Sequence, residues 1–534
     1  MSGKLIYVYF DKANDSTQIF FPETGDLQTI EGCRFYTLLP HNSICWVSQT
    51  SVVEGVYPGG EYPLNREWIA WDNTSEPLEY KYGDTLFRSF RALIGGHDGT
   101  LSKLYNDEPM PVKMHKFVSM FGDPLKVKYT LAHNTVQMFF RELKQMLWDD
   151  TKKHQHFYYD FQTYTDCYAG DKSGLLGAPD GTYGTEHNNV LMFDKKSAYA
   201  GVFIHDDMFP CGKIRNVTAQ NWQFDVKRIK DMIENRIWFK LVIEADLGLK
   251  DSFDNGVTAL EYNDVCYFID VEEIDGWKII VDGMRNNNYR LYRCDETGYM
   301  NDAFRKAFVD LYETKNSCDN PAEKHIYKTQ LAMVYGKGLQ KQNFRNIEDV
   351  QRFYKGRGDR YVYPEHSNHV CARLRYEMLR AAIEGNAIYV DTDGIKVQDT
   401  PENRQLFEEY NNKILQKNKD AGFNTDVGVW KFEGKADRFC VFAKKTYIYT
   451  SNDELTITAA GLTEEGKAIN KRHAGRTADE QFDNMLNKGL MYPLRGYATV
   501  DGHFKEVTKC IFGVDNMQKY LEQKANRSEV VNNE

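Results

Sequence analysis

The stretch that decides the fold of this 534-residue chain is IYVDTDGIKV, residues 388–397, in which two apolar runs flank a short acidic turn. The pattern predicts a β-hairpin. Asp391 and Asp393 are two positions apart, so we expect both carboxylates to project to the same side. Like charges held this close repel each other unless a divalent cation lies between them. The hairpin is therefore a candidate metal site, and an exposed Asp-rich turn is the alternative.

A third carboxylate comes from VLMFDKKSAYAGVF, residues 190–203, where an apolar strand ends in Asp194 and is followed by Ser197 and Tyr199. A single aspartate at a strand end is usually a helix cap or a turn former. Together with Asp391 and Asp393, however, it makes a set of carboxylates that can hold two Mg²⁺ ions about 3.5–4 Å apart, as in-line phosphoryl transfer requires. The two segments together predict a two-metal site.

Two further segments carry cations next to aromatic rings. In EKHIYKTQLAMVYGKG, residues 323–338, helical spacing puts Lys324, Lys328 and Tyr335 on one face, where the cations can grip a triphosphate. A tyrosine beside Gly336 can pack against a base, although a solvated, salt-bridged helix face is the alternative. In AKKTYIYT, residues 443–450, we expect a strand from which a lysine and a tyrosine project together. These two residues are Lys445 and Tyr447.

The charge balance restricts where a polyanion could bind. The chain has 67 Lys and Arg against 77 Asp and Glu, a net charge of −10, so a uniformly basic nucleic-acid coat is excluded. Residues 323–360 form a local exception, with nine basic and four acidic residues interleaved with aromatic rings. Cations that hold phosphates and rings that stack on bases suit a single strand of nucleic acid. Any such site must therefore be a local groove.

The remaining composition indicates a protein of the cytoplasm. No apolar run approaches eighteen residues and the start does not resemble a signal peptide, so we expect no membrane association. The ten cysteines are scattered without a CxxC pair, which argues against a zinc knuckle. The pair His366 and His369 has no companion at metal spacing, and we expect both to be solvated loop residues.

Apolar runs and turn signals also predict the order of the elements. We expect strands at residues 5–10, 17–21 and 33–39, a helix at 136–147, strand-like acidic material at about 239–300 and a basic helical stretch at about 303–340. Strand-rich pieces that carry acids, split by a helical insertion, favour an α+β catalytic sheet.

Four motifs in a fixed order resemble those of family B DNA polymerases. Their size and spacing are similar to the protein-primed polymerases of small bacteriophages with linear genomes, and the likeness covers roughly residues 155–534. The motifs are FDKKSAYAG (193–201) for DxxSLYP, KTQLAMVYG (328–336) for KxxxNSxYG, YVDTDG (389–394) for YxDTDS and KTY (445–447) for KxY.

The resemblance implies an α+β, right-hand polymerase fold with palm, fingers, thumb and two insertions, preceded by a degenerate exonuclease-like α/β domain. The implied divisions are an exonuclease-like domain (1–150), a linker and first part of the palm (151–205), a first insertion that contacts a terminal protein (206–303), fingers (304–340), a second insertion for processivity and strand displacement (341–372), the second part of the palm (373–465) and a thumb (466–534).

The resemblance also implies a role for each candidate residue. The implied metal ligands and catalytic residues are Asp194 and Asp393, assisted by Asp391. The implied nucleotide-binding residues are Tyr199, which would reject a ribose 2′-hydroxyl, together with Ser197, Lys324, Lys328 and Tyr335. The implied primer- and DNA-binding residues are Lys445, Tyr447, Gly336, Thr392, Tyr168 and Gly170. The cofactor would be two Mg²⁺ ions, with Mn²⁺ as a substitute, and the partners would be a DNA primer-template, dNTPs and a terminal protein primer bound by a monomer.

Some positions depart from the family's motifs. The Asn-Ser of the basic helix is Ala332-Met333, and the Ser after the acidic turn is Gly394. The Pro after Tyr199 is Ala200, and the YxGG linker motif appears only as residues 168–171. None of these changes removes a catalytic carboxylate.

The N-terminal region departs further, because the four carboxylates of a 3′–5′ exonuclease are not all present. Residues 11–13 lack the Glu of DxE, residues 80–84 keep only the final Asp of NxxxFD, and the acid of YxxxD is replaced by His133 or Asn134. Loss of one ligand should abolish most two-metal hydrolysis. We therefore predict DNA polymerase activity without proofreading, and the rival interpretation is a catalytically inactive DNA- or replisome-binding protein that retains a polymerase shell.

Overall fold

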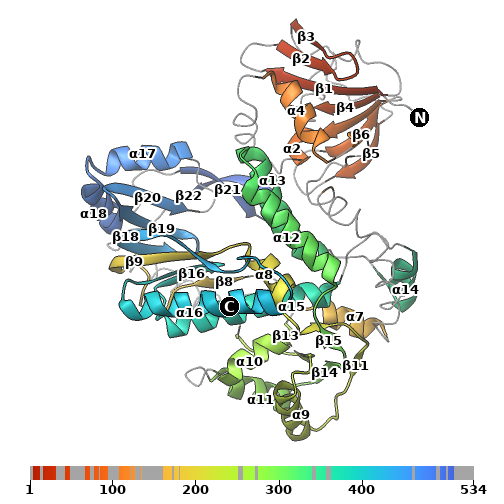
Figure 1. Cartoon of the computed structure of the whole chain (residues 1–534), viewed down its shortest axis with the longest axis vertical. Helices are drawn as coiled ribbons and strands as arrows, with labels where there is room; N and C mark the ends of the chain where they lie inside the picture. Colours follow the sequence, from red (N-terminus) through yellow and green to blue (C-terminus); the bar gives the residue numbers. More distant parts are fainter. Residues whose placement is uncertain are drawn as a thin grey trace, which may run out of the picture. The chain divides into compact units, whose positions relative to one another are not determined.

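The computed structural model forms two compact units, which are described separately (Figure 1). The first comprises Met1–Gln145, Glu313–Lys337 and Thr499–Phe504, and the second comprises Met146–Tyr312, Gly338–Ala498 and Lys505–Glu534. The structure describes residues 4–11, 16–31, 43–47, 66–71, 77–82, 85–93, 108–121, 123–125, 127, 134, 160–170, 174–179, 181–249, 256–270, 275–339, 344–356, 363–459, 464–488, 494–500 and 503–509.

The first unit contains a mixed seven-stranded sheet with the order β3-β2-β1-β4-β7-β6-β5. Strand β1 runs parallel to β4, and β4 runs parallel to β7, whereas the outer strands are antiparallel. The strands are β1 (Lys4–Asp11), β2 (Ser16–Phe21), β3 (Asp26–Glu31), β4 (Ser43–Val47), β5 (Arg66–Trp71), β6 (Pro77–Tyr82) and β7 (Thr85–Ser89).

Apolar side chains on one face of β1 and β4 hold this unit together. Tyr7 and Trp46 are fully buried, and helix α4 (Met110–Ser119) adds Met114 and Phe117 to the same cluster. Helix α2 (Phe90–Leu93) follows β7, and helix α13 (Pro321–Gly338) packs Ile326 into the cluster. The basic helix predicted around residue 330 is therefore present, and its apolar side joins the core of the first unit.

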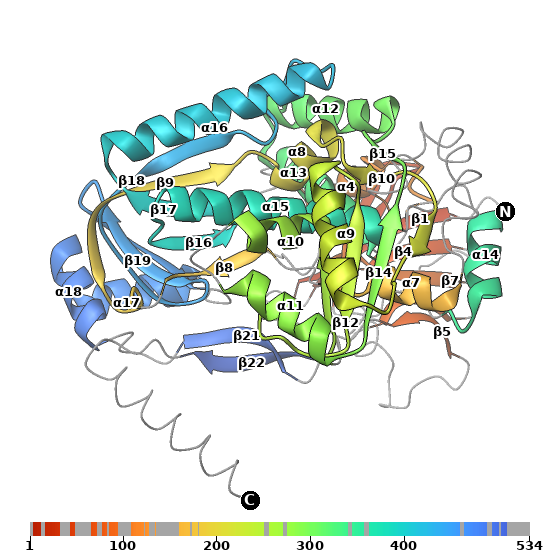
Figure 2. The same cartoon turned by 90° about the horizontal axis from the view of Figure 1, so that it is seen from below.

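The second unit is built on an antiparallel seven-stranded sheet with the order β20-β19-β18-β9-β17-β16-β8 (Figure 2). Strand β9 lies at its centre, which explains the continuous apolar run that precedes Asp194. The strands are β8 (Leu175–Gly177), β9 (Glu186–Lys195), β16 (Tyr389–Thr392), β17 (Gly394–Gln398), β18 (Trp430–Ala443), β19 (Thr446–Ser451) and β20 (Glu454–Ala459).

Two long helices pack against this sheet, α15 (Pro364–Glu384) and α16 (Pro401–Asp420). Thr400 caps α16 by accepting a hydrogen bond from the Asn403 N–H, and Pro401 occupies the first turn. The Phe407 ring of α16 stacks on Phe193 of β9, with their centroids 4.1 Å apart. Helix α8 (Ala198–His205) lies between α15 and α16, so all three helices support the end of β9.

An antiparallel four-stranded sheet with the order β11-β14-β12-β13 follows α8 in the chain. We call residues 206–303 the inserted unit. All five residues of the apolar strand β12 are buried, because neighbouring strands and helices cover both faces. Its elements are β10 (Phe209–Pro210), β11 (Ile214–Asn216), α9 (Trp222–Glu234), β12 (Phe239–Ile243), β13 (Thr258–Glu261), α10 (Tyr262–Asp270), α11 (Gly276–Asn286), β14 (Tyr289–Cys294) and β15 (Thr297–Gly298).

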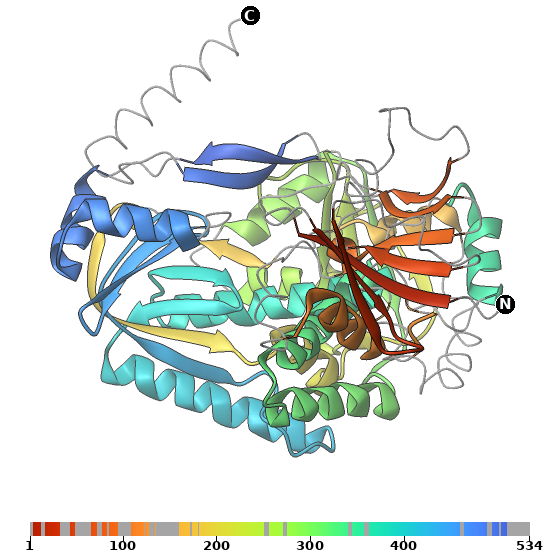
Figure 3. The same cartoon turned by 90° about the horizontal axis from the view of Figure 1, so that it is seen from above.

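The other elements of the chain are mostly helical. Helix α18 packs on β19 and β20 and beside α17, as the blue segments of Figure 3 show. No helix among the described residues is both long and apolar enough to cross a membrane. These elements are α7 (Phe161–Tyr168), α12 (Asp302–Ser317), α14 (Ile347–Gly356), α17 (Glu464–Ala474), α18 (Ala478–Lys488), β21 (Leu494–Val500) and β22 (His503–Lys509).

The strands predicted at 5–10, 17–21 and before Asp194 are confirmed, as are the acidic hairpin and, from Thr446 on, the strand predicted within 443–450. The strand predicted at 33–39 and the helix predicted at 136–147 lie outside the described residues. The expectation of strand-like material at 239–300 is wrong in part, since α10 and α11 interrupt it with helical runs that bury one side. The predicted division at residue 372 falls within the unbroken helix α15.

Candidate active site

The acidic site is a row of residues across three neighbouring strands. Asp391 of β16 pairs with Gly394 of β17, and Gly394 pairs with Asp194 of β9. Residues directly opposite each other in a sheet project to the same face, and neighbouring strands lie about 4.8 Å apart. The two carboxylates therefore stand on one face, with only a glycine between them.

Gly394 keeps this row open. A Cβ atom there would lie 3.3 Å from Asp194 Oδ1 and 3.2 Å from Lys396 Nζ, which is tighter than an ordinary carbon contact. The Ser that the family's motif has at this position would place a side chain in that space. The departure from the motif therefore leaves more room between the carboxylates of Asp391 and Asp194.

Asp393 reaches the site from a turn, not from a strand. The two-residue turn of the hairpin consists of Thr392 and Asp393, and Thr392 has a φ of 62°, a left-handed conformation that a β-branched residue rarely adopts. The backbone N–H of Lys195 donates to the Asp393 carbonyl at 2.9 Å. We expected Asp391 and Asp393 to share a side because side chains alternate along a strand, but this alternation stops at Thr392. A backbone hydrogen bond instead fixes Asp393 beside the end of β9.

Lys396 is a buried cation among these carboxylates that the sequence analysis missed. It is 6% exposed and lies on the same face as Gly394, two residues further along β17. Burial lowers the pKa of its ammonium group, whereas Asp391, Asp194, Glu433 and Asp393 oppose that shift. Its Nζ also lies 5.7 Å from the centre of the Tyr447 ring. The only sequence signal was its position in a strand that is otherwise buried.

Lys445 and Tyr447 come from the neighbouring β18–β19 turn. Lys445 is not on a strand as predicted but in the turn, with a φ of 57°, because Ala443 pairs with Thr446 and closes the hairpin. Its ammonium Nζ lies 3.4 Å from Asp391 Oδ1, and its N–H donates to the Tyr389 hydroxyl at 2.7 Å. The ring of Tyr447 lies 5.5 Å from that of Tyr389. The structure therefore joins the KTY motif to the acidic hairpin.

Tyr199 is the one residue of α8 that is not buried. The helix begins after Ser197, whose φ of 50° turns the chain sharply out of β9. Gly201 lets α8 approach Gly428 closely, since a Cβ atom there would lie 2.8 Å from the Gly428 Cα. Strained backbone at Ser197, Thr392 and Lys445 thus accompanies three of the four motifs, as is common at functional sites.

The basic helix α13 belongs to the first unit up to Lys337, whereas the carboxylates belong to the second. Lys324, Lys328 and Gly336 are exposed and Tyr335 is half-buried, while Ile326 is buried on the opposite side. The predicted helix is present, and its spacing puts Lys324, Lys328 and Tyr335 on one face as expected. Its relation to the carboxylates stays a prediction.

Two predicted DNA-binding residues lie on the α7 segment. The Tyr168 hydroxyl donates to the Leu339 carbonyl at 2.8 Å, and Gly170 has a φ of 136°, which favours glycine. The buried ammonium of Lys240 donates to the Cys167 carbonyl at 2.8 Å and also to that of Ala169. This segment is therefore held rigidly against the inserted unit.

The expectation for one histidine pair is wrong. His366 and His369 lie on α15 and are buried, not solvated in a loop.

Among the positions compared with the exonuclease motifs, only Asn134 has a described side chain, and it is buried. Within the described part of the chain, no three His, Cys, Asp or Glu side chains lie close enough together to form a metal site.

No family model and no curated protein sequence matches the chain. Solved structures do. Phi29 DNA polymerase complexed with primer-template DNA and incoming nucleotide matches with a TM-score of 0.60 and 12% sequence identity, covering 96% of this chain and 100% of that chain. Its orthorhombic crystal form matches with a TM-score of 0.60 and 12% identity, covering 95% and 100%.

The chain has the fold of Phi29 DNA polymerase. The resemblance to protein-primed family B polymerases that four short motifs indicated is thereby confirmed at the level of the fold. A mixed α/β architecture of the Phi29 kind extends over the N-terminal region as well, since 96% of the chain is covered.

Proposed function

We propose that this chain is a template-directed DNA polymerase that adds dNTPs to a 3′ hydroxyl. The observation that carries the proposal is the row Asp391–Gly394–Asp194, with Asp393 hydrogen-bonded beside it and Lys445 paired to it. Phi29 DNA polymerase, whose fold the chain shares, is seen in complex with primer-template DNA and incoming nucleotides. The primer-template and dNTPs are therefore the proposed partners.

The donor set fits magnesium. Asp391 and Asp194 flank Gly394 on one face of the sheet, Asp393 follows in the adjoining turn, and hard oxygen ligands are those that Mg²⁺ prefers. Asp194 and Asp393 would hold two ions with the assistance of Asp391, and Mn²⁺ could replace them. Bound there, the ions would activate the 3′ hydroxyl and neutralise charge on the phosphate that is attacked.

The protein's own residues would position the reactants. Tyr199 would lie under the ribose and exclude a 2′-hydroxyl, since it alone in α8 reaches the surface. Lys445 and Tyr447 would align the primer end, because they border Asp391 directly. The exposed cations of α13, Lys324 and Lys328, would hold the triphosphate.

Ser197, Thr392, Tyr335, Gly336, Tyr168 and Gly170 would complete the nucleotide and primer contacts. In right-hand terms, the antiparallel sheet would be the palm, the segment at 304–340 the fingers and the segment at 466–534 the thumb. The segment at 341–372 would be the second insertion that assists processivity and strand displacement.

We propose further that replication starts from the hydroxyl of a terminal protein and that the inserted unit contacts this protein. The unit carries a polar cavity of about 580 Å³, whose lining includes Asn216, Trp222 and Arg285. We also propose that residues 1–150 do not proofread, because the sequence lacks a full set of exonuclease carboxylates.

The test compares wild type with Asp393→Asn in the extension of an end-labelled primer with Mg²⁺ and dNTPs. The matched control is Asp437→Asn, which removes an exposed carboxylate from β18 of the same sheet. We expect Asp393→Asn to lose extension by roughly a thousandfold while DNA binding persists, and Asp437→Asn to act like wild type.

Extension by Asp393→Asn at the wild-type rate would refute the proposed site. No activity from DNA or from a terminal protein would favour the rival, a binding protein with a polymerase shell. A labelled primer that shortens without dNTPs would refute the absence of proofreading.

A further inference from the structure

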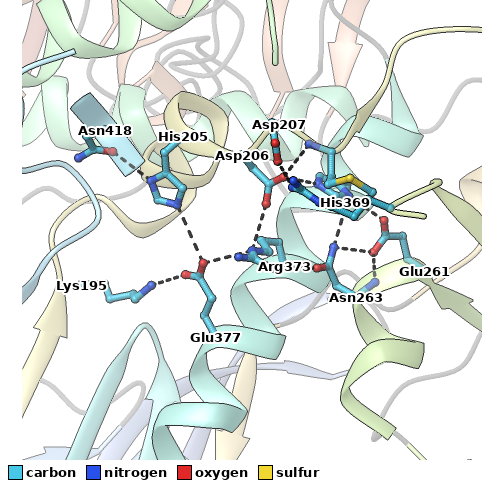
Figure 4. A network of polar contacts seen from close by, with 12 residues as sticks. Lys195, His205, Asp206, Asp207, Glu261, Asn263, His369, Arg373, Glu377 and Asn418 are labelled. Carbon is cyan, nitrogen blue, oxygen red and sulfur yellow. Dashed lines mark hydrogen bonds and ion pairs between the residues drawn. The ribbon is translucent and has the colours of Figure 1, made fainter. Parts of the chain in front are cut away.

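A chain of buried and partly buried charges of alternating sign runs from the acidic site to the inserted unit (Figure 4). It links the end of β9, the residue that follows α8, helix α15 and the end of β13. We call these six residues the charge chain: Lys195, Glu377, Arg373, Asp206, His369 and Glu261. Three cations and three anions alternate in it.

Lys195 is the end of the charge chain nearest to the acidic site. It directly follows Asp194, and its N–H donates to the Asp393 carbonyl at 2.9 Å. Its side chain is 3% exposed, and its ammonium Nζ lies 2.5 Å from Glu377 Oε2 on α15 and 5.3 Å from the centre of the Trp430 ring. One residue thus connects the strand of Asp194, the turn of Asp393 and helix α15.

The middle of the charge chain lies one helical turn away on α15. Arg373 Nε is 3.2 Å from Glu377 Oε1 and 3.0 Å from Asp206 Oδ2. Burial alone would raise the pKa of Glu377, but Lys195, His205 and Arg373 outweigh it and hold that pKa well below its ordinary value. Both carboxylates are therefore charged at neutral pH, since Arg373 and His369 likewise outweigh burial at Asp206 and lower its pKa.

His369 extends the charge chain from Asp206, the first residue of the inserted unit, to that unit's four-stranded sheet. Its Nε2 is 3.4 Å from Asp206 Oδ1, and its Nδ1 is 2.7 Å from Glu261 Oε1 at the end of β13. Glu261 in turn accepts a hydrogen bond from the Asn263 N–H of α10 at 2.8 Å. The charge chain therefore ends in the backbone of the inserted unit.

Such an arrangement is a costly way to fill a core. Buried ion pairs often stabilise a fold no more than apolar side chains of the same volume, but removal of one partner leaves an uncompensated charge. What the ion pairs provide is a defined orientation of each side chain, because a charge-assisted hydrogen bond forms only within a narrow range of geometry.

We propose that Lys195 is a positioning residue for the carboxylates of the acidic site and that the charge chain makes its position depend on the inserted unit. The proposal rests on the proposed polymerase function. Lys195 touches neither nucleotide nor metal in this account; it acts through the Asp393 turn and through Glu377.

The test uses the full chain with Lys195→Met, Lys195→Arg and the adjacent control Lys196→Met. Lys196 pairs instead with Asp426 on the partly exposed side of the same segment. In single-nucleotide incorporation we expect Lys195→Met to lower kcat about a hundredfold while KM for the dNTP and the Kd for DNA stay within about twofold. Lys195→Arg should recover most of kcat, and Lys196→Met should stay within about threefold of wild type.

The far end of the charge chain provides a second test, Glu261→Gln. We expect it to lower kcat about tenfold with unchanged DNA binding, although Glu261 belongs to the inserted unit. A kcat for Lys195→Met equal to that of Lys196→Met, or a failure of Lys195→Arg to recover activity, would overturn the proposal.

Amide hydrogen exchange of the peptide 388–398 separates this proposal from the proposed function, because it does not depend on polymerisation. We expect faster exchange in Lys195→Met and in Glu261→Gln, but not in Lys196→Met. Unchanged exchange would overturn the positioning role even in an active polymerase. If Lys195→Met and Glu261→Gln exchange faster but wild type never extends a primer, the result overturns only the proposed polymerase function and not the positioning role of Lys195.

Discussion

The charge of His369 makes a pH-dependent prediction about stability. Burial alone would lower the pKa of this imidazole, but the carboxylates of Glu261 and Asp206 raise it from 6.5 to about 9. The side chains that face it are those two acids, Asn263 and the Phe209 ring, with Arg373 one turn further along α15. The folded protein therefore holds a proton that the unfolded chain releases near pH 6.5.

A pKa that is higher in the folded state adds stability that is complete below the unfolded pKa and is lost as the pH rises through the folded pKa. The gap between 6.5 and about 9 corresponds to about 3 kcal/mol. We expect about 2.5 kcal/mol of this to disappear between about pH 7 and about pH 10.

The measurement is the difference in free energy of unfolding between wild type and His369→Gln, from urea unfolding at several pH values in that range. Other titrating groups cancel in this difference. His187→Gln is the control, because burial lowers the pKa of His187 and leaves it neutral above pH 7 whether folded or not. A wild-type advantage over His369→Gln that is the same at pH 7 and pH 10 would refute the reasoning.

Three further predictions concern the acidic site and its support. Lys396→Met should lower the Mg²⁺ concentration for half-maximal extension by about tenfold, because the ammonium group of Lys396 repels a cation bound among the same carboxylates. A titration of the extension rate against Mg²⁺ measures this concentration, and a variant that needs more Mg²⁺ than wild type would contradict the prediction. Tyr199→Ala should raise ribonucleotide incorporation relative to dNTP by roughly tenfold or more in single-nucleotide assays, and unchanged discrimination would remove Tyr199 from the ribose site. Phe203→Ala should lower the free energy of unfolding, measured in urea, by about 3–5 kcal/mol, since this buried ring of α8 packs against three others. A decrease below about 1 kcal/mol would show that the aromatic cluster does not support the helix. The three rings are Phe209, Phe304 and Phe308.

Local pattern was sufficient for the acidic hairpin and for strand β9. Each depends on neighbours in sequence, since an apolar run that ends in an acid or a turn behaves the same way wherever it lies. The order of four motifs then indicated a fold that the structure confirms. Their detailed geometry did not follow, because Thr392 and Lys445 adopt left-handed conformations that only the closed hairpins impose.

The charge chain could not be predicted from the sequence for a different reason. The partners of His369 are Asp206 and Glu261, more than a hundred residues earlier, and only the packing of α15 against α8 and α10 brings them together. Without that context an isolated histidine pair has the pattern of a solvated loop. Lys396 was missed similarly, since its surroundings come from strands β9, β16 and β18.

Single-nucleotide incorporation tests most directly whether template-directed chemistry takes place at Asp194 and its neighbours. Each of the four dNTPs is offered separately, with Mg²⁺, to wild type and Asp194→Asn on primers whose next template base is varied. We predict that wild type adds only the nucleotide complementary to the template base and that Asp194→Asn adds none while it still binds the primer-template. Addition regardless of the template base, or the same extension by Asp194→Asn, would contradict the account.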